Sequence, residues 1–512
     1  CSFGLKRRFE EKILYIMKKN INNSKHLLEN KSSDIQFYWS LIFLLISTKT
    51  LFLWKGALLP DEAYYWLWSK NVDISFYDHP PLSSWVQAIF SFAHIGKDFE
   101  IRIVPTVCFI IMFFFNMHWV KQFSNSSNDI LQPWKSSVIF CSVPLYGIFL
   151  TISFPDAVMI LSVYLSAYYF FKFIRSCFQN ESQFIFWYLA IFFFSLSCLG
   201  KYNAILYGLG LLLFILWNRT LRNILLPFHL CVGFVIFLFC QIPIIIWNIN
   251  HNFASINFHF NTRLEFDFSL VSFVADTLVF ASAVILSVSP LIFFKVIQYR
   301  SKKLEKTNEF LYLRSCYWVL LTTLAICVFL NVFTNVLYYW AIIGFVMFIP
   351  LLSFIVEKKS HLFYQAVYGF CFLSLLYVNS TIYPLALFFG PVDRETAILY
   401  GWDEVTDKLE ENKSKYGVDN VIFMDYRLAS LYSFYANDLE ADAIMADRET
   451  QFDIWRLKKK IKPKQVLIIE DHEFPIHEKI GKVFNKIIFL EEFPVVKGKH
   501  ILNVYKIYLA KV

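Results

Sequence analysis

Residues 225–247 read LLPFHLCVGFVIFLFCQIPIIIW, and no Asp, Glu, Lys or Arg interrupts them. A helix of about 20 apolar residues is what the hydrocarbon layer of a membrane requires. Comparable runs occur at 36–53, 101–120, 134–153, 157–174, 183–199, 202–217, 270–294, 316–333, 336–356 and 363–388. The eleven runs predict an α-helical polytopic membrane protein, in which the 183–217 pair is divided by Gly200-Lys201-Tyr202-Asn203.

The composition of the 512-residue chain agrees with this fold class. Hydrophobic residues make up 57% and charged residues 17%, whereas a soluble domain carries about a quarter charged residues. A soluble multidomain protein, a disordered chain and a coiled coil are therefore excluded. The ten cysteines lie in or near apolar segments or at the N-terminus and form no CxxC pair, which argues against a disulfide framework or a thiolate metal site.

The distribution of charge predicts the domain organisation. Residues 390–512 hold 19 Lys/Arg and 21 Asp/Glu, whereas residues 1–389 hold the remaining 29 and 19. We therefore expect a cytoplasmic, interfacial segment over 1–35 that is too polar for a cleavable signal, a membrane domain over 36–389, and a soluble domain over 390–512. The net charge of +8 reflects membrane topology rather than nucleic-acid binding.

Sidedness follows from the basic residues in the connections. With the N-terminus inside, the inner connections hold 22 Lys/Arg and the outer ones seven. Because Lys and Arg are retained on the cytoplasmic side, this bias places residues 390–512 on the outer side of the membrane. Within that tail we expect a small α/β domain, with strands at 419–424, 464–470, 486–491 and 501–508 and helices at 402–413 and 426–436. The tail carries no glycine-rich nucleotide loop and no catalytic motif that we recognise.

The longest early outer connection carries two acidic clusters. It reads LPDEAYYWLW over 59–68 and YDHPPL over 77–82, so that Asp61 and Glu62 precede Asp78 and His79. Asp61 could simply cap the helix that follows, and Trp and Tyr are ordinary at a membrane interface. The second cluster favours chemistry, because its two prolines turn Asp78 and His79 back toward the membrane surface. A carboxylate pair beside an apolar wall suits a general base that activates a hydroxyl.

Other polar groups fall on the same side of the predicted topology. Lys201 between two apolar helices either snorkels to the interface or, with Arg263, binds the phosphate of a lipid-linked substrate. Asp156 is as consistent with a helix cap as with a functional group, and the aromatic residues suit either an interfacial belt or a sugar face. The candidates for substrate binding are His79, Tyr64, Tyr65, Asp156, Lys201, Tyr202, Asn248, His251, Arg263, Tyr339 and Trp340, and Ser255 and His259 lie among them.

A metal site has one candidate. Glu265 and Asp267 form an acid-x-acid pair on an outer loop, where a solvated loop is the favoured interpretation and a divalent cation is not expected. No other cofactor is predicted.

The motifs LPDEAYYWLWSK and YDHPPLSSWV, followed in order by FPDAVMI, LGKYNAIL, IPIIIWNINHNFASINFHFNTR and TNVLYYWA, resemble bacterial members of a glycosyltransferase family. This family is related to the dolichyl-phosphate-mannose protein mannosyltransferases (family 39-like) and shares the GT-C architecture with the lipid A aminoarabinose transferase. The tail DNVIFMDYRLASLYSFYAN with FDIW resembles the periplasmic end of bacterial members, so that the resemblance extends over nearly the whole chain from about residue 36.

The resemblance implies a polyprenyl-phosphate sugar donor and inverting transfer outside the cytoplasmic membrane. By position, Asp61 with Glu62 is the catalytic carboxylate and Asp78 is the second acidic residue. His79 stands where the aminoarabinose transferase has Lys and the O-mannosyltransferases have the His of HPP, which argues against a specific aminoarabinose assignment. A single displacement from a phosphate leaving group needs one base and no metal.

The acceptor favoured by this interpretation is lipid A or core lipopolysaccharide. The Ser or Thr hydroxyl of a protein is the alternative acceptor within the enzyme class. A transporter or flippase of lipid-linked sugars is the alternative from another class, but it predicts polar groups in the middle of helices and internal repeats. Here the polar groups lie at helix ends. An inactive assembly subunit is a third alternative.

Overall fold

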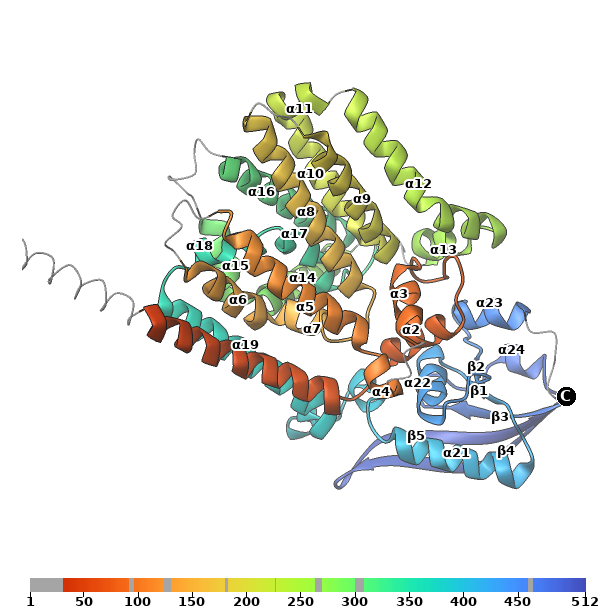
Figure 1. The fold of residues 1–512 in the computed structure, drawn as a ribbon. Helices are drawn as coiled ribbons and strands as arrows, with labels where there is room; N and C mark the ends of the chain where they lie inside the picture. The colour runs from red at the N-terminus through yellow and green to blue at the C-terminus, as the bar shows by residue number, and fades with distance from the viewer. Residues whose placement is uncertain are drawn as a thin grey trace, which may run out of the picture.

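The computed structural model describes residues 31–91, 96–123, 130–179, 183–225, 227–262, 269–299, 308–458 and 464–512. A helical body is followed by a smaller C-terminal α/β domain (Figure 1). Within these ranges, seven helices are long and apolar enough to cross a membrane, namely Lys31–Lys55, α5 (Ile103–Val120), α8 (Asp156–Phe178), α12 (Phe228–Asn250), α14 (Leu270–Val288), α16 (Asn308–Leu330) and Lys359–Ile382, which joins α19 (Lys359–Tyr377) to η5 (Val378–Ile382). The predicted helical membrane fold is confirmed.

Several predicted runs are broken rather than continuous. Pro144 separates α6 (Gln132–Ser142) from α7 (Pro144–Phe149), and Pro290 begins α15 (Pro290–Gln298) after α14, because proline cannot continue the hydrogen-bond ladder of a helix. Two pairs are bent, Tyr202–Trp217 against α11 (Arg219–Leu225) by 104° and Tyr338–Val346 against Ile349–Ile355 by 60°. Their members are η1 (Tyr202–Ala204) with α10 (Ile205–Trp217), η3 (Tyr338–Ala341) with α17 (Ile342–Val346), and η4 (Ile349–Leu351) with α18 (Leu352–Ile355).

The number of crossings is therefore not settled by helix length. If each bent pair is one span, the described residues contain up to nine candidates. The shorter apolar helix α9 (Phe184–Gly200) ends at Lys201, where the sequence predicts a break. Eleven crossings stay a prediction.

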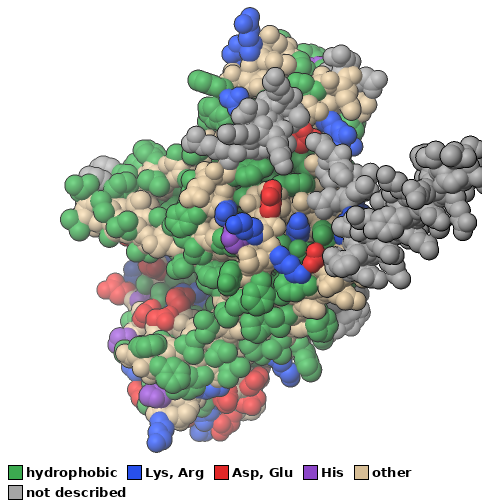
Figure 2. All heavy atoms as spheres, turned by 90° about the vertical axis from the view of Figure 1, so that its left-hand side faces the viewer, with side chains coloured by type: hydrophobic (Ala, Val, Ile, Leu, Met, Phe, Trp, Pro, Cys, Tyr) green, Lys and Arg blue, Asp and Glu red, His purple; other side chains and the backbone are tan. Residues whose placement is uncertain are grey.

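The helices differ in how they are buried. Most of α8 lies inside the bundle, whereas α12 exposes apolar side chains such as Phe239, which is 73% exposed. An apolar surface of this kind suits contact with lipid, since no water is available there to solvate polar groups. On the face shown in Figure 2, hydrophobic side chains cover a broad area of the helical body and charged side chains gather at the end formed by the C-terminal domain.

The first extramembrane segment contains α2 (Pro60–Lys70), α3 (Leu82–Ser91) and α4 (Lys97–Glu100). Helix α2 packs on α22 (Tyr426–Ala436) of the C-terminal domain, where the rings of Trp66 and Phe434 lie 5.2 Å apart. Figure 1 shows α2, α3, α13 (Ala254–Asn257) and the C-terminal domain at one end of the helical body, with α11 toward the other. These connections, predicted to be outer ones, thus meet the tail at one end.

The C-terminal domain is built on a five-stranded sheet in the order β2-β1-β3-β5-β4. β1 (Val421–Phe423) is parallel to β2 (Asp442–Ala443) and β3 (Gln465–Glu470), whereas β5 (His500–Lys511) is antiparallel to β3 and to β4 (Lys486–Lys497). The helices of the domain are α20 (Arg394–Ala397), α21 (Trp402–Tyr416), α22, α23 (Gln451–Lys458) and α24 (Glu478–Gly481). Two short helices precede it: η2 (Phe258–Thr262) follows α13 in the body, and η6 (Leu385–Phe388) leads into the domain. The predicted strands and helices are present; the two-residue β2 is too short for a periodicity to reveal it.

Candidate active site

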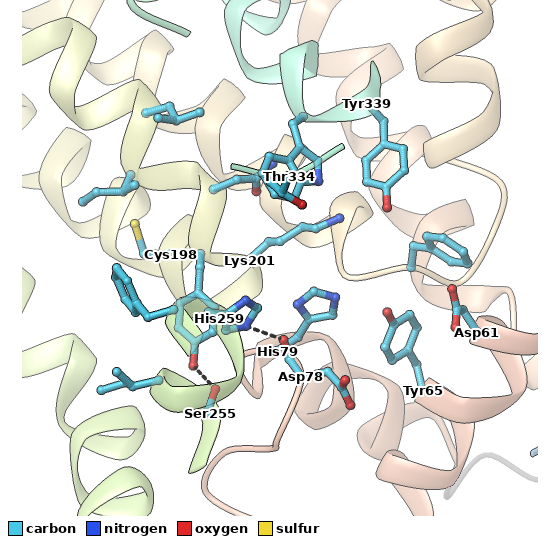
Figure 3. Close-up of a pocket in the computed structure, with 18 of the residues that line it drawn as sticks. Asp61, Tyr65, Asp78, His79, Cys198, Lys201, Ser255, His259, Thr334 and Tyr339 are labelled. Atoms are coloured by element: carbon cyan, nitrogen blue, oxygen red, sulfur yellow. Dashed lines mark hydrogen bonds between the residues drawn. The ribbon is translucent and has the colours of Figure 1, made fainter. Parts of the chain in front are cut away.

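A cavity of about 520 Å³ lies between the first extramembrane segment, the ends of the long helices and the C-terminal domain (Figure 3). Its polar lining comprises Asp61, Tyr64, Tyr65, Asp78, His79, Lys201, Tyr202, Asn203, Gln241, Ser255, His259, Thr334, Tyr339, Trp340, Tyr426 and Arg448. Its apolar lining comprises Phe154, Cys198, Ile205, Leu206, Phe237, Ile256, Phe260 and Leu330. One cavity thus brings together most of the residues that the sequence predicts.

Asp61 lies in the first turn of α2 and faces this cavity (Figure 3). The hydroxyl of Tyr426 donates a hydrogen bond to Asp61 Oδ1 at 3.2 Å. Burial is the main influence on this carboxyl and raises its pKa, against the opposing charge of Arg427 and the Tyr426 hydrogen bond. A carboxylate with a raised pKa accepts protons more readily than one in water, as a general base must.

Asp78 lies on the loop between α2 and α3, and three groups contact it. Tyr64 Oη donates to Asp78 Oδ2 at 2.7 Å, and Arg448 Nη1 lies 3.4 Å from Oδ1. On the backbone side, His259 Nε2 lies 3.0 Å from the Asp78 carbonyl oxygen. These contacts hold the second acidic residue at the cavity wall as an ion-paired carboxylate.

Glu62, which the sequence predicts to act with Asp61, lies away from the cavity. It is 0% exposed and does not line the cavity, because successive residues of a helix point about 100° apart. Arg102 Nη2 lies 2.7 Å from Glu62 Oε2 and Arg102 Nε donates to Oε1 at 2.9 Å. The amides of Ser153 and Leu59 also donate to this carboxylate. Glu62 therefore ties α2 to the body, and the catalytic role predicted for it is not carried into our proposal.

Lys201 reaches the cavity from the break between α9 and η1. Its Nζ lies 2.6 Å from Asp156 Oδ2 and 4.6 Å from the centre of the Tyr339 ring. Asp156 is fully buried behind this lysine, in the first turn of α8, and is not part of the cavity wall. The predicted binding role of Asp156 is thus indirect, since this residue positions Lys201.

Aromatic and imidazole rings form much of the remaining wall. The His79 ring lies 5.7 Å from Tyr65 and 6.4 Å from His259, and Tyr202 Oη is 3.2 Å from Ser255 Oγ. Figure 3 shows His79, His259 and Lys201 between the Asp61 side and the Cys198 side of the cavity. The predicted binding residues Tyr64, Tyr65, His79, Tyr202, Tyr339 and Trp340 all line it.

Besides Asp156, two more predicted binding residues do not line the cavity. Asn248 Oδ1 accepts a hydrogen bond from the Ile256 amide at 3.3 Å, and its amide nitrogen donates to Ile244 O at 3.0 Å. The His251 ring stacks on Trp247 with centroids 4.2 Å apart. Both side chains shape the turn at the end of α12, because a helix end leaves backbone groups that need partners. Arg263, Glu265 and Asp267 lie outside the described residues.

Sequence reasoning missed several lining residues, among them Tyr426, Arg448 and Gln241. Tyr426 lies in the tail motif DNVIFMDYRLASLYSFYAN, which the sequence analysis did not connect with the site. Arg448 lies in none of the quoted motifs, and Gln241 lies within an apolar helix. A glutamine in the middle of a predicted span is the one signal that was available. In the part of the chain that the structure describes, no group of three or more His, Cys, Asp or Glu is arranged to hold a metal ion.

Comparison with known proteins gives the class. A family model described as dolichyl-phosphate-mannose-protein mannosyltransferase matches residues 78–247. ArnT from Cupriavidus metallidurans is similar in the apo state and bound to undecaprenyl phosphate, with a TM-score of 0.58 for both, identities of 11% and 10%, and coverage of 92% of this chain and 98% of that chain. The apo oligosaccharyltransferase of Archaeoglobus fulgidus matches with a TM-score of 0.43 at 12% identity, over 85% of this chain and 69% of that chain. Among curated proteins, none matches the sequence.

The structural likeness over nearly the full length shows that the chain has the GT-C fold of ArnT. The family match, which covers less than half of the chain, adds the kind of activity. Together, the family match and the fold indicate a membrane glycosyltransferase with the fold of ArnT.

Proposed function

We propose that this protein transfers a sugar from a polyprenyl-phosphate donor to a hydroxyl acceptor, with Asp61 as the general base. The observation that carries the proposal is a single cavity with carboxylates at one end and an apolar wall at the other. Ile205, Ile256 and Phe260 in that wall are 41%, 43% and 65% exposed on the helical body, where lipid would surround them. A ligand with a polar head and a long apolar tail fits both ends.

The tail of such a donor has a place to lie. A second, apolar hollow of about 230 Å³ lies among α8, α9, α10 and α12 and shares Ile205 and Phe237 with the main cavity. ArnT has been solved with undecaprenyl phosphate bound, which supports a donor of the same lipid class here. The apolar path would direct the phosphate toward Lys201.

The proposed reaction is a single displacement at the anomeric carbon. Asp61 accepts the proton of the acceptor hydroxyl while the oxygen forms a bond to this carbon, and the bond from the carbon to the phosphate oxygen breaks. The lipid phosphate leaves with that electron pair. Attack opposite to the leaving group inverts the configuration, and no covalent sugar–enzyme intermediate is needed.

Lys201 and His79 are the groups that we propose for the departing phosphate. A lysine ammonium has three donors, so that Lys201 can keep Asp156 and still donate to a phosphate. His79 lies between Tyr65 and His259 on the same wall. Fixed donors aimed at a developing charge stabilise the transition state more than the ground state.

We further propose that the acceptor is lipid A or core lipopolysaccharide on the periplasmic side of a bacterial inner membrane. The exposed apolar rim at Ile256 and Phe260 supports an acceptor that is itself a lipid. The Lys/Arg bias of the connections supports the periplasmic side, because residues of the predicted outer connections, such as Asp61, Asp78 and Ser255, line the cavity. Cysteine labelling of the 71–81 loop from the periplasm tests the sidedness.

The decisive test compares Asp61→Asn with Asp73→Asn in reconstituted protein supplied with undecaprenyl-phosphate sugars. Asp73 lies on the same segment but pairs with Lys458 away from the cavity. We expect Asp61→Asn to lower transfer by roughly 10²–10⁴-fold, the contribution of a general base, and Asp73→Asn to leave it unchanged. Near-normal transfer by Asp61→Asn would refute the base assignment.

The acceptor is tested separately by mass spectrometry of lipid A and of periplasmic proteins from cells with and without the gene. A sugar lost from lipid A or the core supports the proposed acceptor. A sugar lost from periplasmic proteins instead identifies a protein Ser or Thr hydroxyl and contradicts it.

A further inference from the structure

We propose that the C-terminal domain is a working part of the active site, in which Tyr426 and Arg448 hold the two cavity carboxylates. Tyr426 contacts Asp61 across 365 positions of the chain, and Arg448 contacts Asp78 across 370. The inference rests on the proposed function in taking Asp61 as the reacting group. Tyr426 and Arg448 are positioning residues in this scheme.

The fold of the domain places Tyr426. Asp425 follows the carboxyl end of β1 and caps α22, where it accepts a hydrogen bond from the Arg427 amide at 3.0 Å. Arg394 Nη2 lies 2.5 Å from Asp425 and 2.8 Å from Asp471, which follows the neighbouring parallel strand β3. The first residue of α22 is therefore held at the edge where parallel strands end, the usual position of functional groups in α/β domains.

A separate segment of the domain places Arg448. Lys479 Nζ donates to the carbonyls of Met445 and Ala446 at 3.1 and 2.9 Å, which fixes the chain just before Arg448. The guanidinium lies 4.6 Å from the centre of the Tyr426 ring and 5.2 Å from that of Phe258. Two aromatic faces thus hold the cation against Asp78, an arrangement that stabilises Arg through its planar charge.

Gln451 extends this control to the proton of Tyr64. The backbone N–H of Gln451 donates to Tyr64 Oη at 2.8 Å, and its side-chain Oε1 accepts from the backbone N–H of Tyr77 at 2.8 Å. A phenol has one hydrogen, so that Tyr64, which accepts from Gln451, directs its own proton to Asp78 at 2.7 Å. Gln451 is fully buried. The C-terminal domain therefore orients the hydroxyl of Tyr64, which lies on α2, toward Asp78.

The charges around Asp61 agree with this geometry. Burial raises the pKa of Asp61 and is the largest influence, while Arg427, Tyr426 and Arg448 of the C-terminal domain lower it. The nearby charge of Asp78 raises the pKa further. Tyr65, on the same helix, also interacts with the charge of Asp61. Removing Tyr426 or Arg448 should thus favour the protonated carboxyl and move its titration to higher pH.

The alternative is that these contacts only dock the domain onto the body. The Trp66–Phe434 packing and the Lys458–Asp73 pair already belong to that interface. Docking alone predicts a loss of thermal stability when Tyr426 or Arg448 is changed, with no effect on the titration of Asp61.

The experiment follows the protonated carboxyl band of Asp61 by infrared titration of the purified full-length protein. The Asp61→Asn variant identifies the band. We expect the midpoint to rise by about one pH unit in Tyr426→Phe and in Arg448→Ala. Tyr508→Phe and Arg456→Ala are the matched controls, because Tyr508 donates to Glu470 at 2.8 Å and Arg456 pairs with Asp442 at 2.6 Å, in the same domain but outside the cavity. Both controls should keep the midpoint of the unchanged protein.

Thermal unfolding shows whether each variant is folded. The Arg448→Lys variant keeps the positive charge that Arg448→Ala removes. A return of the midpoint toward that of the unchanged protein in Arg448→Lys supports the proposal. An unchanged midpoint in both Tyr426→Phe and Arg448→Ala overturns it, even if their melting temperatures fall. A shifted midpoint in a protein that transfers no sugar supports this inference and contradicts the proposed function.

Discussion

Asp61 and Glu62 are neighbours on α2, yet their surroundings differ in almost every respect. Glu62 is fully buried and takes hydrogen bonds from Arg102 and from the amides of Ser153 and Leu59. Asp61 faces the cavity, where Tyr426 donates to it at 3.2 Å. The rotation of the helix alone puts one carboxylate into the packing of the body and the other at the cavity wall.

The difference separates a carboxylate that is fully paired inside the body from one that is open to the cavity. The carboxylate oxygens of Glu62 accept hydrogen bonds from groups whose removal would leave a buried charge without a partner. Burial raises the pKa of Asp61, and the cavity leaves room for a substrate beside its carboxyl group. Lys201 lies between these extremes, because it is paired with buried Asp156 but its ammonium still lines the cavity.

The largest expected effect is on stability and concerns the ion pair of Glu62 with Arg102. Arg102→Ala leaves Glu62 as an unpaired buried charge, and we expect the free energy of unfolding to fall by about 3–5 kcal/mol. Lys70→Ala is the control, since its pair with Glu100 has the same distance of 2.7 Å but a more exposed lysine. That control should lose less than about 1 kcal/mol. Equal losses in denaturant titrations of the two variants would contradict the structural role of Glu62.

A second, smaller effect concerns Lys201. If its ammonium binds the donor phosphate, Lys201→Ala should raise the KM for the polyprenyl-phosphate sugar by about tenfold, as expected for one lost ionic hydrogen bond. The double variant Lys201→Ala with Asp156→Ala removes the buried carboxylate that the single variant leaves unpaired. We expect the double variant to keep the raised KM. Recovery of the normal KM would show that Lys201 only neutralises Asp156.

The smallest expected effect is on the pKa of Asp61 and comes from its neighbour Asp78. The negative charge of Asp78 raises the pKa of Asp61, so that Asp78→Asn should lower it. Because the base acts when deprotonated, the acidic limb of the pH profile of kcat/KM should move to lower pH by less than about one unit. This shift is opposite in sign to the one expected for Tyr426→Phe. A shift to higher pH in Asp78→Asn would be inconsistent with the charge argument.

Much of the architecture could be predicted because it depends on local properties of the chain. Each predicted apolar run coincides with helical structure, and the β1, β3, β4 and β5 strands were visible as alternating or continuous apolar segments. Breaks such as those at Pro144 and Pro290 were harder to place, since proline within an apolar run either kinks a helix or ends it. The run lengths alone therefore could not fix the number of crossings.

Only part of the candidate site could be predicted from the sequence. The acidic clusters, His79 and Lys201 were found by their unusual polarity beside apolar runs, and all but Glu62 of the first-loop candidates line the cavity. Asn248 and His251 carried the same signal, yet their side chains stabilise a turn. A polar residue next to a membrane span indicates a function or a local structural requirement, and the sequence pattern is the same for both.

By itself the sequence determined which segments are apolar, where charged residues become frequent and which connections carry the unusual polar clusters. These features depend on neighbours in the chain and on the hydrophobic effect, which acts on composition. Only the tertiary structure decided that Asp61 rather than Glu62 faces the cavity, that Lys201 is paired, and that Tyr426 and Arg448 complete the site. Those outcomes depend on the rotation of a helix and on contacts between residues hundreds of positions apart, which no local pattern records.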